Sequence, residues 1–299
     1  MNSLGTATTQ FGFDLFKELN KTKDGNIFFS PVSITTAIGM LPLGTRGATA
    51  TQLQEVLFSE KDTGSSRIIA EGNEVMEKRE EIHHQFQTFL SEISKPNNNY
   101  ELKIANRLFG EKTYLFLHKY LDYVEKHYHA SLEPVDFVNA ADESRKKINS
   151  WVESQTHGRT KQVSQIIDGI SPEKLVEWTN PEHMEERTVN LRLPRLEVED
   201  SYNLEAILPA MGLGAAFSEH EAAYSGMSPL SGLHAQQFLH RSFMVANEEG
   251  TEAAAATGVG FVVTSEAGHE AFHCNHPFLF FIRHNGSSSI LFFGRFSSP

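Results

Sequence analysis

A tract of small side chains near the C-terminus is the feature that most constrains this chain. Residues 250–260 read Gly-Thr-Glu-Ala-Ala-Ala-Ala-Thr-Gly-Val-Gly and separate an apolar segment at 238–246 from two more at 278–282 and 290–296. By composition alone the tract is a flexible, partly helical connector. Its four alanines favour a helix, but Gly258 and Gly260 oppose one.

A second interpretation of the same tract starts from a period of two. In an extended chain alternate residues share one face. The small residues Thr251, Ala253, Ala255 and Thr257 would then all point to one side, with Glu252 pointing to solvent. A segment that slides into a sheet over a packed core needs small inward residues of this kind. Gly250 could supply the backbone freedom of a hinge. This pattern favours a loop that can become a strand.

Hydrophobic periodicity divides the rest of the chain into a helical first part and a strand-rich last part. Helices are predicted at 11–19, 31–41, 48–57, 84–93, 117–128, 142–155, 172–178 and 203–213, with an exposed loop at 59–81. Strands are predicted at 100–109, 132–137, 188–199, 238–246, 278–282 and 290–296, with a hairpin turn at Asn285–Gly286. This order favours an α+β fold with mostly antiparallel sheets. Because no clear linker interrupts it, we expect one domain over residues 1–299.

Charge and composition argue against several classes of partner. The formal net charge is -12 and the sequence pI is about 5.6, which disfavours nucleic acid and anionic membranes. No window approaches 18 apolar residues, so no transmembrane helix is expected. With one cysteine, Cys274, and no recognisable signal peptide, we expect a cytoplasmic protein. Export without a signal peptide stays open.

We expect no enzyme, and no catalytic residue, cofactor or metal. This expectation is that the sequence contains none of four common catalytic or binding motifs: a hydrolase nucleophile motif, a phosphate-binding loop, a zinc-protease motif or a pair of closely spaced cysteines. His118, His127 and His129 cluster near one predicted helix, and we interpret them as a solvated face rather than as metal ligands. Cys274 is interpreted as a small core residue rather than a nucleophile.

Four motifs at the two ends of the chain together resemble the serpin family. Residues 248–257 match the family's loop hinge, and residues 272–282 match its C-terminal signature. Residues 26–33 match the strand that leads into helix B, and residues 193–195 with 211–212 match the region of strand 6A and helix I. The final residues Phe-Phe-Gly-Arg-Phe-Ser-Ser-Pro, with no signal peptide, resemble the intracellular, ovalbumin-like branch.

This resemblance implies a serpin fold, in which helices pack on mostly antiparallel sheets and a mobile reactive-centre loop stands out. It implies a protease inhibitor that acts as a suicide substrate. The protease cleaves the loop and forms an acyl-enzyme, and the loop then inserts into sheet A and distorts the protease. The implied hinge comprises Glu248, Glu249, Gly250, Thr251, Glu252, Ala253, Ala254, Ala255, Ala256 and Thr257. The implied reactive bond joins Thr264 to Ser265.

The resemblance also implies partners and a control region. Val263, two places before the cleaved bond, suits papain-like cysteine proteases, whereas Thr264 is a poor residue for a trypsin-like pocket. The target is therefore a cysteine cathepsin or a chymotrypsin-like serine protease. Ser30, Ser33 and His240 match the family's shutter region. Without the resemblance, His240 would be interpreted as an ordinary half-buried strand histidine.

An internal deletion separates this chain from the family pattern. After the helix at 142–155, only residues 156–169 precede Ser171, which resembles the start of helix H. Strand 3A, several strands of sheets B and C, and a short helix should intervene, on the order of 90 residues. The deletion at about 156–170 predicts open strand edges and exposed apolar surface. Three alternatives follow: an inhibitor with impaired activity, a non-inhibitory serpin-like interaction protein, or a non-functional truncated isoform.

Overall fold

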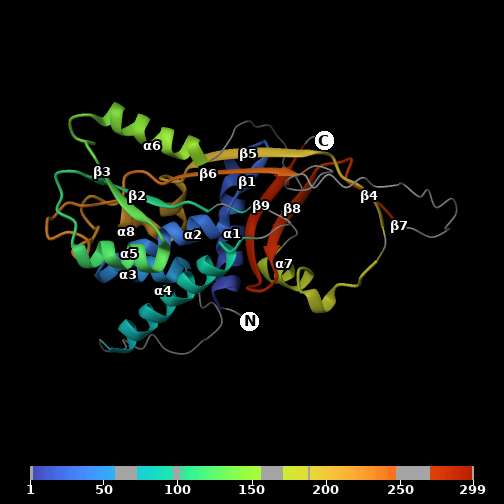
Figure 1. Ribbon diagram of the computed structural model, residues 1–299, viewed down its shortest axis with the longest axis horizontal. Coiled ribbons are helices and arrows are strands. Elements are labelled where there is room, and N and C mark those ends of the chain that lie inside the picture. Colours follow the sequence, from blue (N-terminus) through green and yellow to red (C-terminus); the bar gives the residue numbers. More distant parts are fainter. Residues whose placement is uncertain are drawn as a thin grey trace.

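The computed structural model describes residues 3–57, 73–96, 102, 104–155, 171–187, 189–246 and 270–297 (Figure 1). Its α-helices are α1 (Ser3–Thr22), α2 (Pro31–Met40), α3 (Gly47–Leu57), α4 (Asn73–Ile93), α5 (His118–Tyr128), α6 (Ala141–Gln155), α7 (Pro172–Trp178) and α8 (Gly214–Phe217). Its strands are β1 (Ile27–Phe29), β2 (Arg107–Glu111), β3 (Ser131–Val135), β4 (Val189–Arg192), β5 (Leu196–Asn203), β6 (Leu239–Ala246), β7 (Glu270–His273), β8 (Phe278–His284) and β9 (Ser289–Phe296).

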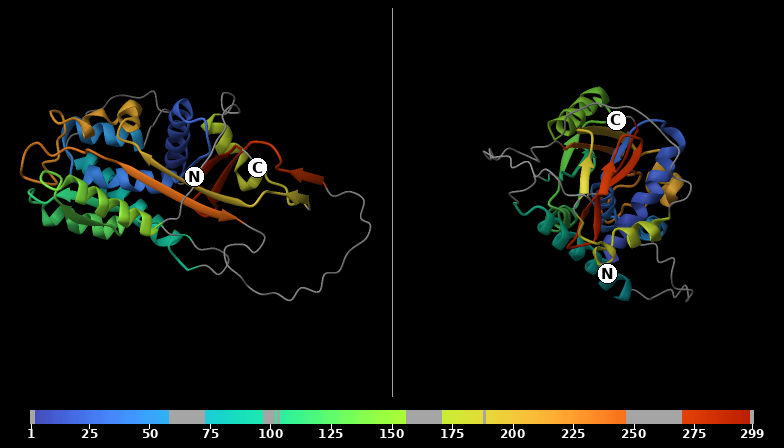
Figure 2. Two further views of the ribbon diagram at one scale, coloured as in Figure 1. Left: turned by 90° about the horizontal axis from the view of Figure 1, so that it is seen from above. Right: turned by 90° about the vertical axis from the view of Figure 1, so that its right-hand side faces the viewer.

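A three-stranded antiparallel sheet of order β1-β9-β8 forms the centre of the molecule. Helices α1 and α2 pack on β9, and helices α3, α4 and α5 gather at one end, while β4 and β7 lie at the other (Figure 1). The antiparallel pair β5–β6 runs along one side of the long axis (Figure 2). The expected α+β fold with mostly antiparallel pairing is confirmed, although β2–β3 and β4–β7 are parallel.

The alternation of side chains in β1 and β9 builds a core on both faces of the central sheet. Phe29 and Phe293 point to one face, where Phe293 packs against Phe16 of α1 with ring centres 4.6 Å apart. Phe28 points to the other face and stacks on Phe292 at 5.3 Å, towards β5 and β6. Because consecutive strand residues face opposite sides, both cores follow from one apolar run.

The start and end of α2 follow from local side chains. The hydroxyl of Ser30 accepts a hydrogen bond from the Ser33 amide at 3.1 Å, and Pro31 occupies the first turn. The helix ends at Met40, and Pro42 lies in a following 3-10 turn, Leu41–Leu43, so this proline does not interrupt the helix.

Some secondary-structure predictions are wrong for identifiable reasons. Helix α4 begins at Asn73, inside the predicted loop at 59–81, and β2 begins at Arg107, within the predicted strand 100–109. The single strand predicted at 188–199 is two strands, because Pro194 has no N–H for a ladder. In place of the single helix predicted at 203–213, the structure has the end of β5 at Asn203 and a π-helical turn at Pro209–Leu213. Gly212 in this turn has φ 109°, and Pro209 cannot donate a helical hydrogen bond.

Every described strand except β9 has one paired neighbour among the described strands. Within the described ranges, β2 pairs only with β3, β6 only with β5, and β8 only with β9. Residues 156–170, where the deletion is predicted, lie outside the described residues. The division into one domain stays a prediction.

Candidate functional site at the start of helix α2

Side chains of β5 and β6 bind the free backbone edge of β1. Strand β1 pairs with β9 along one edge. On its other edge, Phe28 donates its N–H to Asp200 Oδ2 at 3.3 Å, and its carbonyl accepts from Ser242 Oγ at 2.7 Å. Buried backbone groups need hydrogen-bond partners. The Tyr202 hydroxyl also accepts from the Phe28 N–H, at 3.3 Å, so side chains of β5 and β6 do the work of a neighbouring strand here.

His240 on β6 joins this contact at the start of α2. Its Nε2 accepts a hydrogen bond from the Ser30 N–H at 3.0 Å, so Nε2 carries no proton. Removal from solvent lowers the pKa of His240 from 6.5 to about 3, because the buried ring is costly to charge. The histidine is thus buried and neutral, rather than half-buried as the simpler interpretation had it.

The structure brings the three predicted shutter residues together. Ser30 contacts both His240 and Ser33. The hydroxyl of Ser33 lies 3.4 Å from Oδ1 of Asn106, in the segment that leads into β2. The start of α2 therefore touches β6 on one side and the approach to β2 on the other. The control role of these residues stays a prediction.

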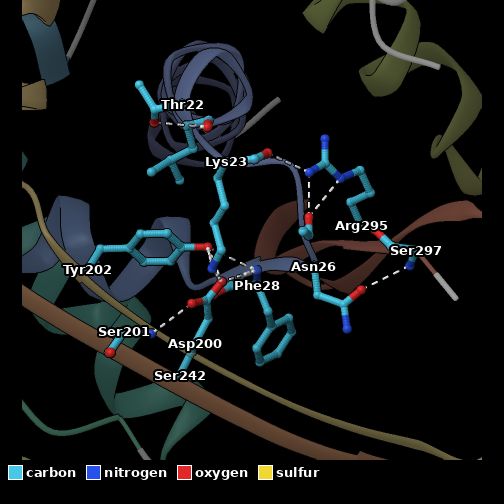
Figure 3. A network of polar contacts seen from close by, with 12 residues as sticks. Thr22, Lys23, Asn26, Phe28, Asp200, Ser201, Tyr202, Ser242, Arg295 and Ser297 are labelled. Atoms are coloured by element: carbon cyan, nitrogen blue, oxygen red, sulfur yellow. Dashed lines mark hydrogen bonds and ion pairs between the residues drawn. The ribbon is translucent and has the colours of Figure 1, made fainter. Parts of the chain in front are cut away.

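Sequence reasoning missed a charged cluster beside this site (Figure 3). Asp200 is buried, and Lys23, Tyr202 and the Phe28 N–H all donate to it. A signal was present in the sequence. In β5, alternate residues Leu196 and Val198 face the core, and Asp200 continues the same face. An acid at an inward strand position requires buried partners.

The predicted loop residues lie outside the described residues. Strand β6 ends at Ala246 and β7 begins at Glu270. The hinge, residues 248–257, and the reactive bond between Thr264 and Ser265 fall in the interval between them. Their assignment therefore stays a prediction.

One sequence motif was overlooked, and the structure places its last four residues in a strand. Residues 269–273 read His-Glu-Ala-Phe-His, which has the spacing of the zinc-protease motif. That motif binds zinc on a helix, where residues four apart share a face. Here Glu270–His273 form strand β7, and His269 lies outside the described residues. Among the described residues, no group of three or more potential ligands is placed to hold a metal ion.

The other candidate residues behave differently from one another. Cys274 is buried, as expected of a core residue, and directly follows β7. His118 and His129 are exposed, but His127 is buried, so the interpretation of all three as a solvated face is wrong for His127. Burial lowers the pKa of His127, and neighbouring Lys126 lowers it further. Among the described residues, no helix has the length and apolar character needed to cross a bilayer.

Comparison with known proteins decides the family. The chain matches the family described as Serpin (serine protease inhibitor) over residues 6–164 and 159–299. This chain belongs to the serpin family. The predicted family and its ovalbumin-like branch are therefore confirmed.

Named relatives share the whole length of this serpin. It is 57% identical to human Serpin B13, also called hurpin or headpin, which the sequence motifs also suggest, and 40% identical to human Serpin B3. Each alignment covers 100% of both chains. The solved structure of uncleaved ovalbumin, 28% identical, covers 99% of this chain and all of its own, with a TM-score of 0.79.

The same comparisons confirm the internal deletion. The alignment with human Serpin B13 spans 391 positions, and this serpin has 299 residues, so at least 92 positions have no counterpart in it. The two matched ranges of the family meet at residues 159–164, inside the predicted interval.

Proposed function

We propose that this serpin is a protease inhibitor that acts as a suicide substrate, cleaved between Thr264 and Ser265. The protease nucleophile attacks the carbonyl carbon of Thr264, the peptide bond breaks, and the amine of Ser265 leaves with a proton. An acyl-enzyme remains. Family membership supports this proposal, as does a 34% identical relative from Xenopus tropicalis named leukocyte elastase inhibitor. The catalytic groups belong to the protease.

The open edge of β6 is the observation that carries the proposal. Strand β6 pairs with β5 along one edge only, among the described strands, and the proposed hinge begins two residues after β6 ends. An extended peptide can pair with such an edge. The hydrogen bond between Ser30 and His240 holds the neighbouring start of α2 against β6, which supports the proposed shutter role of these residues.

The missing strand sets how well such an inhibitor traps its target. In the family the loop inserts between strands 3A and 5A, and gains hydrogen bonds on both sides. The deletion implies that strand 3A is missing, and we propose that β6 corresponds to strand 5A. An inserting loop then gains one ladder instead of two. We therefore expect most encounters to end in hydrolysis of the acyl-enzyme, and a minority in a stable complex.

The proposed partners are a cysteine cathepsin, favoured by Val263, and a chymotrypsin-like serine protease. We propose the cytoplasm as the place of action. Neither nucleic acid nor membrane is a proposed partner, given the net charge of -12.

A second candidate function is a non-inhibitory serpin-like interaction protein. It is favoured by an uncovered apolar face on β4–β7, where Leu191 and Phe272 pair side by side and are both exposed. Exposed apolar faces of this kind mark interaction sites or aggregation-prone surfaces. A truncated isoform without function is the remaining alternative, and it predicts wholesale digestion.

A mixing experiment with a cathepsin L-like protease and a chymotrypsin-like protease tests these functions. We expect a main product cut after Thr264 and a minor complex of higher mass that survives denaturing electrophoresis. Ala253→Arg, at an inward hinge position, should abolish the complex and leave cleavage intact. The matched control Glu252→Arg, at the adjacent outward position, should keep the complex. Cleavage elsewhere with no complex contradicts the inhibitor proposal.

A further inference from the structure

The turn between β8 and β9 carries the one asparagine of the sequence that a glycine follows, Asn285–Gly286. Both residues are exposed, in the connection 285–288. In many hairpins such a pair serves a turn whose central residues need positive φ. Here Ser288, at φ 58°, is the turn residue in that region, and Gly286 is not. The backbone therefore does not require a glycine at 286, and what Gly286 contributes is the absence of a side chain.

The side-chain amide of Asn285 and the main-chain nitrogen of Gly286 are both placed to react. Arg283 Nη1 donates to Asn285 Oδ1 at 3.4 Å. Negative charge develops on this oxygen when the amide carbon is attacked, and a nearby cation stabilises it. The Gly286 N–H makes no hydrogen bond within the described part of the chain, whereas the Ser287 N–H donates to His284 Nδ1 at 3.2 Å. No bond therefore has to break before the Gly286 nitrogen can move.

The backbone of this turn packs closely on two helices. Gly5 of α1 has no room for a side chain, because a Cβ atom there would lie 2.5 Å from the carbonyl oxygen of Ser287. Glu92 of α4 also faces the turn, with its Oε1 3.9 Å from His284 Nε2. A longer main chain after residue 285 would press on α1, since packed backbones leave no spare volume. A new negative charge there would repel Glu92.

We propose that Asn285 is a site of spontaneous deamidation, and that its product loosens the β8–β9 turn from α1. The nitrogen of Gly286 bonds to Cγ of Asn285 and gives up its proton, and the side-chain amide leaves as ammonia. Water then opens the resulting succinimide ring at either carbonyl. One opening gives aspartate, and the other gives isoaspartate, which adds a methylene to the main chain. Water is the sole co-reactant, and the inference does not depend on protease inhibition.

Ageing of the folded full chain at neutral pH, followed by tryptic mass spectrometry, tests the modification. The peptide 284–295 should accumulate both deamidated forms. Its isoaspartate should accept a methyl group from S-adenosylmethionine when an isoaspartyl methyltransferase is added. The peptide 188–192 is the internal control, because its Asn190 is exposed but is followed by Leu191, and it should stay intact. Equal rates at Asn285 and Asn190 overturn the proposal.

Two variants and an unfolded control separate the turn from the dipeptide. Gly286→Ala should keep the turn, because the atom nearest the new Cβ is Glu92 Oε1 at 3.1 Å, the end of a flexible side chain. It should slow deamidation on the order of tenfold, since a Cβ restricts the backbone rotation that ring closure needs. Arg283→Met should slow it severalfold. Faster reaction of the chain unfolded in urea would show that the turn protects Asn285, and would overturn the proposal.

Hydrogen exchange of the aged chain tests the effect of the product on α1. Exchange in residues 3–10 should accelerate severalfold relative to fresh protein, because the lengthened turn no longer fits against Gly5. Residues 141–150 of α6 should keep their rates. Gly286→Ala aged for the same time is the matched control and should exchange like fresh protein. Unchanged exchange in residues 3–10 of a fully deamidated chain contradicts the loosening.

Discussion

Two neighbouring pairs of strands, β5–β6 and β4–β7, differ in whether a second layer covers them. Only residues 193–195 separate β4 from β5. In β5, Leu196 and Val198 are buried against the central sheet. In the other pair, Leu191 is 54% exposed and its register partner Phe272 is 59% exposed. Both have the same period-two alternation, so local pattern sets the strand and the rest of the chain decides its burial.

The two pairs of strands also differ in their polar contacts with the rest of the molecule. Strands β5 and β6 bind β1 through Asp200 and Ser242, and β6 binds the start of α2 through His240. The pair β4–β7 instead projects beyond the end of the central sheet (Figure 1). The difference teaches that, among the described residues, one part of this serpin is consolidated by buried polar contacts and another keeps an exposed apolar face. Four expected outcomes test this contrast.

The largest difference between the two regions should appear when one phenylalanine in each is replaced by alanine. Phe28→Ala should lower the free energy of unfolding by about 3–5 kcal/mol, because the ring is 1% exposed and stacks on Phe292. Phe272→Ala should change it by less than about 0.5 kcal/mol. Urea denaturation measures both. Similar losses in the two variants would show that β4–β7 is covered in solution.

Acid should weaken the consolidated region through His240. Its pKa is about 3 in the folded chain and 6.5 ordinarily, so the unfolded chain binds more protons between these values. Stability should therefore fall as the pH drops from 6.5 towards 3, by about 1.4 kcal/mol per pH unit.

His240→Gln removes this titration and keeps an oxygen that can accept from Ser30. Urea unfolding at pH 7, 6, 5 and 4 compares the two chains. Parallel pH profiles would mean that the histidine is charged, or accessible to solvent, in the folded chain.

Ser242→Ala should have a smaller effect. It leaves the buried carbonyl of Phe28 without the 2.7 Å bond from the Ser242 hydroxyl, which should lower the free energy of unfolding by about 1 kcal/mol. Ser201→Ala, at an exposed position of β5, is the matched control and should be neutral. Thermal unfolding of the two variants separates them, and equal melting temperatures would contradict the bridging role of Ser242.

Changes to the exposed apolar face of β4–β7 should have the smallest effect on the free energy of unfolding, but they should change self-association measurably. Leu191→Ser combined with Phe272→Ser removes apolar surface and should reduce self-association, because such faces promote contacts between chains. Light scattering at increasing concentration measures it. If scattering does not change, this face plays no part in association.

Local pattern predicted the elements of the site, and the family resemblance predicted its residues. The Ser30–Pro31 pair marks the start of α2 and alternation marks β6, but only the resemblance grouped Ser30, Ser33 and His240, which do lie together. Asp200 and Lys23 were missed, because they are 177 positions apart and no periodic pattern connects them. His127 was misjudged, because a polar side chain on a helix is buried only if another element packs over it.

The sequence alone determined the family, the elements with strong periodicity, and the presence of a deletion. These depend on local order along the chain, where turn residues and apolar spacing act over a few positions. The tertiary structure alone decided that Pro194 divides one predicted strand in two, that β1 completes its edge with side chains, and that β4–β7 has no cover. These depend on which distant segments meet, and burial and hydrogen bonding are settled only by that meeting.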